Sequence, residues 1–257
     1  MMRRFLHLSF AGGLALLASG SALALPALAA SRAPAGARSS VVAEAKAINL
    51  KAADLSTSIR WVAAPAGKSS KAEAALAQKA LTCLKKVGSV SPDPFGTTGK
   101  TGGAVLADVS SPNWYDKASS LTQLPSASSE VVFVNSAAAA RSDLATIGRG
   151  SSLACLTAQL VANSELQGAG SGIKGTAKFL PAPRHGGGSG GVHIQFIESG
   201  GGFALLKAKL YDNAFYYVQG SAEVTMSFIN LGSAFNPAWT TASIAKVMAR
   251  AQAEVKS

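Results

Sequence analysis

A glycine-rich run at residues 185–191 holds the side chains that come closest to a catalytic group. Ser189 is the central residue of a G-x-S-x-G pattern, the spacing that presents the nucleophile in many serine hydrolases. His185 opens the run and His193 follows it, so each imidazole is a candidate general base. Asp212 or Glu198 would then orient the imidazole. This set defines one alternative for the chain, a secreted serine hydrolase.

The surroundings of Ser189 lack the context that this chemistry needs. The nucleophile of such a hydrolase lies on a turn between a strand and a helix, and its oxyanion loop lies on a separate turn. Here both patterns fall within one low-complexity glycine stretch. We therefore expect no catalytic residue, and a surface position for the histidines.

Aromatic residues form a second candidate site. Phe215 and Tyr217 alternate with Tyr216 in a predicted strand, so the first two share a face and Tyr216 points the other way. Trp114 and Trp239 add two further amphipathic rings. One interpretation is ordinary sheet core and rim. The other is the lining of an apolar, ligand-binding groove between sheet and helices, with tyrosine hydroxyls at its mouth.

The chain has two cysteines, Cys83 and Cys155, which fall on two predicted amphipathic helices. An exported protein meets an oxidising environment, so we expect one disulfide that joins these helices. Closing a loop of that length contributes about 4 kcal/mol in the chain-entropy model. Two thiols without nearby histidines do not make a zinc site, so we expect no metal.

Hydrophobic periodicity and capping residues predict the secondary structure. The predicted helices span residues 71–84, 137–147, 152–166 and 238–255, and the predicted strands span residues 104–110, 129–134, 174–180, 192–198, 203–219 and 221–229. Because strands follow one another without helices between them, we predict an α+β fold. Its antiparallel sheet would have about five to seven strands, with helices packed on one face and one inter-helix disulfide.

The first 31 residues have the pattern of an export signal. Arg3 and Arg4 precede an uncharged run from Phe5 to Ala30 that ends in small residues. We predict a signal peptide at 1–29, a flexible leader at 30–42 and one α+β domain at 43–257. An uncleaved anchor helix is the alternative, since the uncharged run is long enough to span a bilayer. No cysteine follows the run, so a lipid anchor is not expected.

The formal net charge is +11, from 24 basic and 13 acidic residues. This excess favours anionic surroundings such as an envelope surface, or it is a dispersed solvating charge. The basic residues are not clustered with aromatics, so we expect no nucleic-acid partner. No later stretch is apolar enough to cross a membrane, and we expect no transmembrane segment after cleavage and no cofactor.

A resemblance to exported actinobacterial domains rests on two stretches. One is Val131–Ala140, a strand that runs into an alanine-rich helix, followed by Leu153–Leu156 with its cysteine. The other is the strand 222–229 with the residues 230–235 before the last helix. Over residues 131–255 the chain resembles the extracellular sensor domain of PknH-type kinases and the PsbP-like exported proteins. The PknH-type domain has two disulfides, whereas this chain can form one.

The resemblance implies an α+β module that binds a ligand or partner, and it carries over no functional residue. The sequence therefore predicts an exported, non-enzymatic, sensor-like binding domain at the cell envelope. Its partner would be a lipid, a small molecule or an envelope protein. A structural or stress protein that acts through its surface is a third class, beside the hydrolase alternative.

Overall fold

Eight strands form one antiparallel sheet at the centre of the computed structural model, which describes residues 35–64, 71–87, 105–119, 124–166, 168–185, 190–205 and 207–255. The strand order is β1-β3-β4-β8-β7-β6-β5, and β2 pairs with β4 on the same side as β3. The strands are β1 (Trp61–Ala63), β2 (Val105–Ser110), β3 (Trp114–Asp116), β4 (Ser126–Val134), β5 (Ile173–Leu180), β6 (Val192–Gly200), β7 (Leu210–Gln219) and β8 (Ala222–Leu231).

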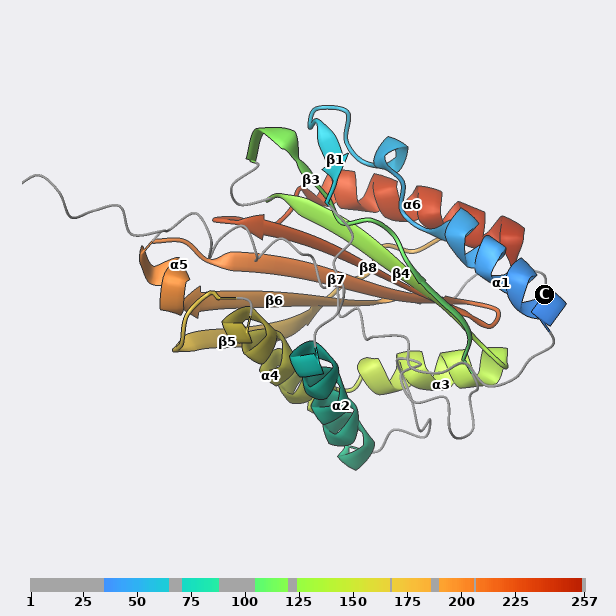
Figure 1. Ribbon diagram of the computed structural model, residues 1–257, viewed down its shortest axis with the longest axis horizontal. Helices are drawn as coiled ribbons and strands as arrows, with labels where there is room; N and C mark the ends of the chain where they lie inside the picture. Colours follow the sequence, from blue (N-terminus) through green and yellow to red (C-terminus); the bar gives the residue numbers. More distant parts are fainter. Residues whose placement is uncertain are drawn as a thin grey trace, which may run out of the picture.

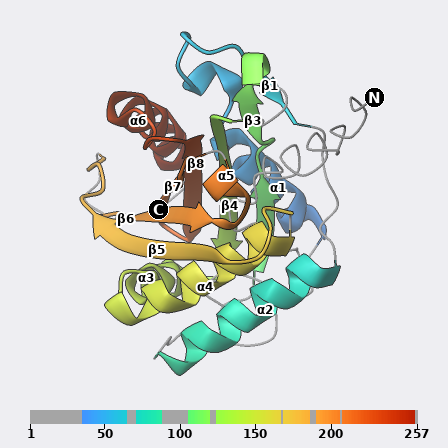
Figure 2. The same cartoon turned by 90° about the vertical axis from the view of Figure 1, so that its left-hand side faces the viewer.

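Helices pack on both faces of this sheet (Figure 1). One layer consists of α1 (Ala35–Ile48) and α6 (Pro237–Glu254). The other consists of α2 (Lys71–Lys86), α3 (Ala137–Ile147) and α4 (Gly150–Leu166), as the view in Figure 2 also shows. The described residues also form three short helices: the 3-10 helices η1 (Ala52–Asp54) and η2 (Lys117–Ser119), and α5 (Gly201–Leu205).

Strand alternation divides the core between the two helix layers. In β7, Phe215 and Tyr217 join the cluster under α1 and α6, whereas Ala214 and Tyr216 join the cluster under α2 and α4. Successive side chains of a strand point to opposite faces, so each long central strand contributes to both clusters. The face under α1 and α6 holds the largest apolar cluster, and the other face carries the buried acids Glu130, Glu198 and Asp212.

The predicted α+β class, the antiparallel sheet and the inter-helix disulfide are confirmed. Cys83 of α2 is bonded to Cys155 of α4, with their Cα atoms 5.7 Å apart. Ser136 caps α3 by accepting a hydrogen bond from the Ala139 amide at 3.1 Å, and Pro237 occupies the first turn of α6. The sheet has eight strands, where the sequence led us to expect five to seven.

Two local differences explain why helices cover both faces, where one covered face was expected. α1 begins at Ala35, inside the segment 30–42 that we expected to be a leader, because Val41 and Val42 pack against the core. Polar residues of β8, which would face solvent in a sheet covered on one face only, lie under the second layer, and Ser227 is fully buried. The predicted strand 203–219 begins only at Leu210.

The segment before β7 is instead the short helix α5. Gly200 and Gly201 both have positive φ, the region that favours glycine, and this turns the chain sharply out of β6. Phe203 of α5 is then buried in a small third cluster at this end of the sheet. Phe203 is therefore apolar because it is a core residue of a short helix, and not because it belongs to a strand.

An ion pair fixes the layer of α1 and α6. Arg250 of α6 bonds to Asp54 at 2.6 Å and donates to the carbonyl oxygens of Ile48 and Asn49 at the end of α1. The guanidinium group thereby satisfies carbonyls that a helix end leaves without partners. Among the described residues, no helix combines the length and the apolar character required to cross a membrane.

Candidate functional site

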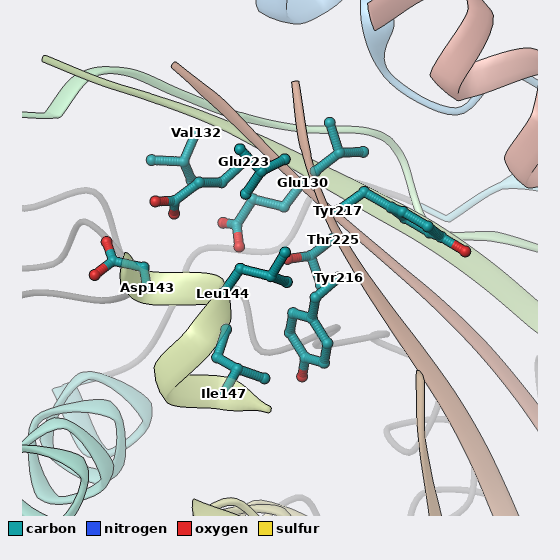
Figure 3. A pocket seen from close by; sticks show the side chains of 11 residues that line it. Glu130, Val132, Asp143, Leu144, Ile147, Tyr216, Tyr217, Glu223 and Thr225 are labelled. Carbon is teal, nitrogen blue, oxygen red and sulfur yellow. The ribbon is translucent and has the colours of Figure 1, made fainter. Parts of the chain in front are cut away.

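A pocket lies between α3 and the sheet, on the face opposite α1 and α6 (Figure 3). The space of the pocket, together with open solvent at its mouth, is about 360 Å³. Its polar lining consists of Glu130 of β4, Tyr216 of β7, Glu223 and Thr225 of β8, and Asp143 of α3. Its apolar lining includes Val132, Leu144, Ile147 and Val218.

Strand register brings the polar groups together. Glu130, Thr225 and Tyr216 are direct neighbours across β4, β8 and β7, so they form one row on this face. Val132 and Glu223 pair in the next row. Both glutamate side chains extend from the sheet on the side of α3 (Figure 3).

Helix α3 closes the pocket from above. Asp143, Leu144 and Ile147 lie on its sheet-facing side at the spacing of one helical turn. The Ser136 cap fixes where this helix begins, and so fixes which of its residues face the sheet. Asp143 is buried, which is unusual for an aspartate.

Glu130 is a buried acid of the site with a strongly perturbed pKa. Burial raises the pKa of its carboxyl well above the usual range, and the charge of Asp108 on β2 and a hydrogen bond to it raise this pKa further. Ser110 donates to the same group and opposes the shift. The raised pKa favours the protonated form of Glu130, in which its carboxyl group can donate a hydrogen bond to Asp108.

Tyr216 supplies an unsatisfied hydroxyl. Its side chain is 3% exposed, and its ring reaches from β7 toward Ile147 of α3 (Figure 3). Among the residues that the structure describes, the hydroxyl has no hydrogen-bond partner. Burial, then Asp212 and Glu130, raise the pKa of this hydroxyl, so it stays protonated and can both donate and accept.

Two further buried acids lie on the same face, outside the pocket lining. The Ser164 hydroxyl of α4 donates to Glu198 at 2.7 Å, and the Ser227 hydroxyl donates to Asp212 at 2.7 Å. Burial raises the pKa of Glu198 to about 7 and the pKa of Asp212 to about 6, against the opposing effect of each serine. These hydrogen bonds join α4 to β6 and join β8 to β7.

The predicted ligand residues lie on the other face. Phe215 and Tyr217 are buried in the cluster under α1 and α6, and Trp114 and Trp239 pack against that cluster. The Tyr217 hydroxyl donates to the Pro183 carbonyl at 3.0 Å. The structure thus brings the four aromatics together around one packed core, and the pocket of Figure 3 lies on the opposite side of the sheet. Tyr217 is among the residues that line this pocket, but its ring points away from the pocket toward the packed core.

The hydrolase residues are only partly described. Ser189 lies outside the described residues. The ring nitrogens of His193 contact the Pro181 carbonyl at 3.3 Å and Asn213 at 3.2 Å, and its ring stacks on Phe215. His185 packs edge-on against Tyr217. Burial lowers the pKa of both histidines.

The sheet separates His193 from the two acids proposed to orient it. His193 pairs with Phe215 and lies on that face, whereas Asp212 and Glu198 lie on the face under α4. The two acids have serine partners of their own. The triad arrangement considered for His193 is therefore not formed by these residues.

Apart from Tyr217, the residues that line the pocket were not predicted as site residues from the sequence. Glu130 stands in the predicted strand 129–134 beside four apolar residues, and a carboxyl inside a central strand is the signal that marks it. Asp143 and Glu223 belong to different elements, so only the tertiary structure places them together. Among the described residues, no group of three or more acidic, histidine or cysteine side chains is arranged to hold a metal ion.

No protein family, no curated protein and no solved structure gives a significant match to this chain.

Proposed function

We propose that this chain is an exported, non-enzymatic binding protein of the cell envelope, and that its ligand enters the pocket between α3 and the sheet. The observation that carries the proposal is the Tyr216 hydroxyl, which is buried in the pocket wall and lacks a partner among the described residues. A buried hydroxyl without a hydrogen bond costs free energy, and a bound ligand would restore the bond.

Two independent features support export. Residues 1–31 have the basic, apolar and small-residue order of a signal peptide. The disulfide between Cys83 and Cys155 is of the kind that persists in oxidising compartments. The sensor-like role is the proposal that the resemblance over residues 131–255 adds.

Binding fits the pocket better than catalysis. The described lining contains no serine, cysteine or histidine, the side chains that most often act as nucleophile or base. Glu130 and Asp108 bond to each other, an arrangement that stores a proton in a site without a nucleophile. These groups are suited to hydrogen bonding and to charge compensation.

Native mass spectrometry of the protein isolated from its own host tests the proposal. We expect an extra mass that is lost on denaturation. The Leu144→Trp variant, which fills the pocket from α3, should be bare, while the Ala145→Trp control places the same side chain on the exposed face of α3 and should retain the extra mass. Bare wild-type protein, or an unchanged adduct in Leu144→Trp, contradicts a binding role for this pocket.

A further inference from the structure

The charge of the pocket is opposite to the charge of the chain. Three of the 13 acidic residues, Glu130, Asp143 and Glu223, line this pocket in a protein of net charge +11, and a fourth, Asp108, is hydrogen-bonded to Glu130. The described residues that line the pocket include no lysine, arginine or histidine. Burying carboxyl groups in this way is costly unless a proton or a cation compensates them.

Building on the proposed binding function, we infer that the pocket takes a small organic cation, a short alkylammonium ion, held by the Glu130–Asp108 carboxyl pair and the Tyr216 hydroxyl.

The carboxyl pair provides the anionic end of this site. Glu130 is 8% exposed, pairs across the strands with Thr225 and bonds to Asp108 on β2. With no ligand, the shared proton cancels one of the two charges. An arriving ammonium group replaces that proton as the compensating charge, and the proton leaves to solvent. Both carboxylates then accept N–H bonds from the same cation.

Tyr216 and the apolar lining set the shape of the ligand. The phenol oxygen has free lone pairs for a third N–H bond, and its ring offers a face for a cation. Beside it, Leu144 and Ile147 of α3 form an apolar wall that suits a few methylene groups (Figure 3). A positive head next to a short alkyl chain therefore matches the pocket at both ends.

The size of the pocket and the arrangement of its acids further restrict which cation can bind. The volume of about 360 Å³ includes open solvent at the mouth, so the enclosed part is smaller than a usual small-molecule site; it suits an ammonium head, with the short alkyl chain lying toward the mouth. The described acids do not assemble into a metal-binding group. The site therefore favours an organic ammonium ion over a divalent metal.

Three probes of equal chain length separate the possibilities: n-butylammonium, n-butanol and butyrate. Each is titrated into the disulfide-bonded protein at pH 7.5 and followed through backbone amide signals by NMR. We expect n-butylammonium to shift the amides of Glu130, Tyr216 and Thr225, and to bind at least about tenfold more tightly than n-butanol. Butyrate should not bind.

Substitutions locate the cation. Glu130→Gln should weaken n-butylammonium binding about tenfold or more, and Tyr216→Phe should weaken it less. Glu223→Gln, at a half-buried wall position, is a second test if Glu130→Gln does not fold. Glu198→Gln is the matched control, because it alters a buried acid of the same face outside the pocket lining, and it should leave affinity unchanged.

The pH dependence of n-butylammonium binding provides an independent test. The titratable groups around Glu130 are Asp108 on β2, Glu223 on β8, Tyr216 on β7 and Asp143 on α3. Because the cation displaces a proton, its affinity should fall as pH is lowered from 8 to 6, and the binding heat should vary with the ionisation enthalpy of the buffer. Affinity that is independent of pH overturns the proton exchange at Glu130.

The outcomes distinguish the ligand class from the binding function. If n-butanol or butyrate binds as tightly as n-butylammonium, or if Glu130→Gln and Glu223→Gln both keep full affinity, the cation inference is wrong and the pocket still binds. If the native adduct is an anion, the same conclusion follows. Bare native protein overturns the proposed function, and with it the inference that rests on it. A native adduct beside failure of n-butylammonium to bind overturns the cation inference alone.

Discussion

At the scale of single residues, two buried acids should make the stability of the fold depend on pH. Glu198 and Asp212 are both held below a helix layer, and each has a raised pKa because burial disfavours its charged form. A raised pKa in the folded state means that the folded protein binds the proton of each carboxyl group more tightly than the unfolded chain does. The resulting stability is present below the unfolded pKa and is lost as pH rises through about 7 for Glu198 and about 6 for Asp212.

The Glu198→Gln variant should therefore be more stable than the wild type at pH 8.5, by about 1–3 kcal/mol. The advantage should shrink toward pH 5, where the folded wild-type carboxyl is already protonated. Urea unfolding at both pH values measures it. Glu254→Gln, on α6 in the other layer, is the control and should show no such pH-dependent gain. An equal effect of Glu198→Gln at pH 5 and 8.5 would contradict the assignment.

The sequence could predict which face each residue of β7 occupies, but not what covers it. Alternation placed Phe215 and Tyr217 on one face and Tyr216 on the other, as observed. The sequence analysis assigned ligand binding to Phe215 and Tyr217 because they are large aromatic residues on one strand face. The pocket formed around Tyr216 instead, because Asp143 and Glu130 reach it from distant parts of the chain. Spacing along a sequence carries no information about such contacts.

At the scale of elements, α2 depends on its disulfide. It packs against α4, and Cys83 is bonded to Cys155 across 72 positions of the sequence. Removing the bond enlarges the conformational freedom of the unfolded chain.

The Cys83→Ala/Cys155→Ala double variant should lose about 2–5 kcal/mol of unfolding free energy, measured in urea. Hydrogen exchange should accelerate most in α2, which has the fewest other attachments among the helices of that layer. Reductant should destabilise the wild type by a similar amount and leave the double variant unchanged. Uniform acceleration throughout the protein would contradict a local role for the bond.

Elements with strong local signals were predictable. The range of α3 was predicted residue for residue, because Ser136 caps its start and glycines follow its end. α1 was missed because its alanines and serines give weak periodicity; in the structure Ala45 and Ile48 are its fully buried residues, and Val41 and Val42 pack beside them. The second helix layer follows from α1 and α6 together, so a prediction that omitted α1 left one face open.

At the scale of the whole molecule, the export hypothesis has a direct test. Protein recovered from the culture medium or the envelope should begin near Ala30 and lack residues 1–29. Its intact mass should also show two hydrogens fewer than the reduced form, because of the disulfide.

Ala29→Leu serves as the control for that experiment, since a bulky residue at the cleavage position should leave the full-length chain on the membrane. Wild-type protein that keeps residues 1–29 would support the anchor alternative instead. The described residues include no helix able to take the place of such an anchor.

The position of β5 at the end of the sheet has a consequence for how the protein behaves in a crowded solution. A terminal strand offers unpaired backbone groups that another chain can extend, which is a common route to aggregation. Lys174 and Lys178 are exposed on one face of β5. A second copy that paired antiparallel along this edge would bring such ammonium groups close together. Their mutual repulsion opposes edge-to-edge pairing of β5, the one long strand that ends the described sheet.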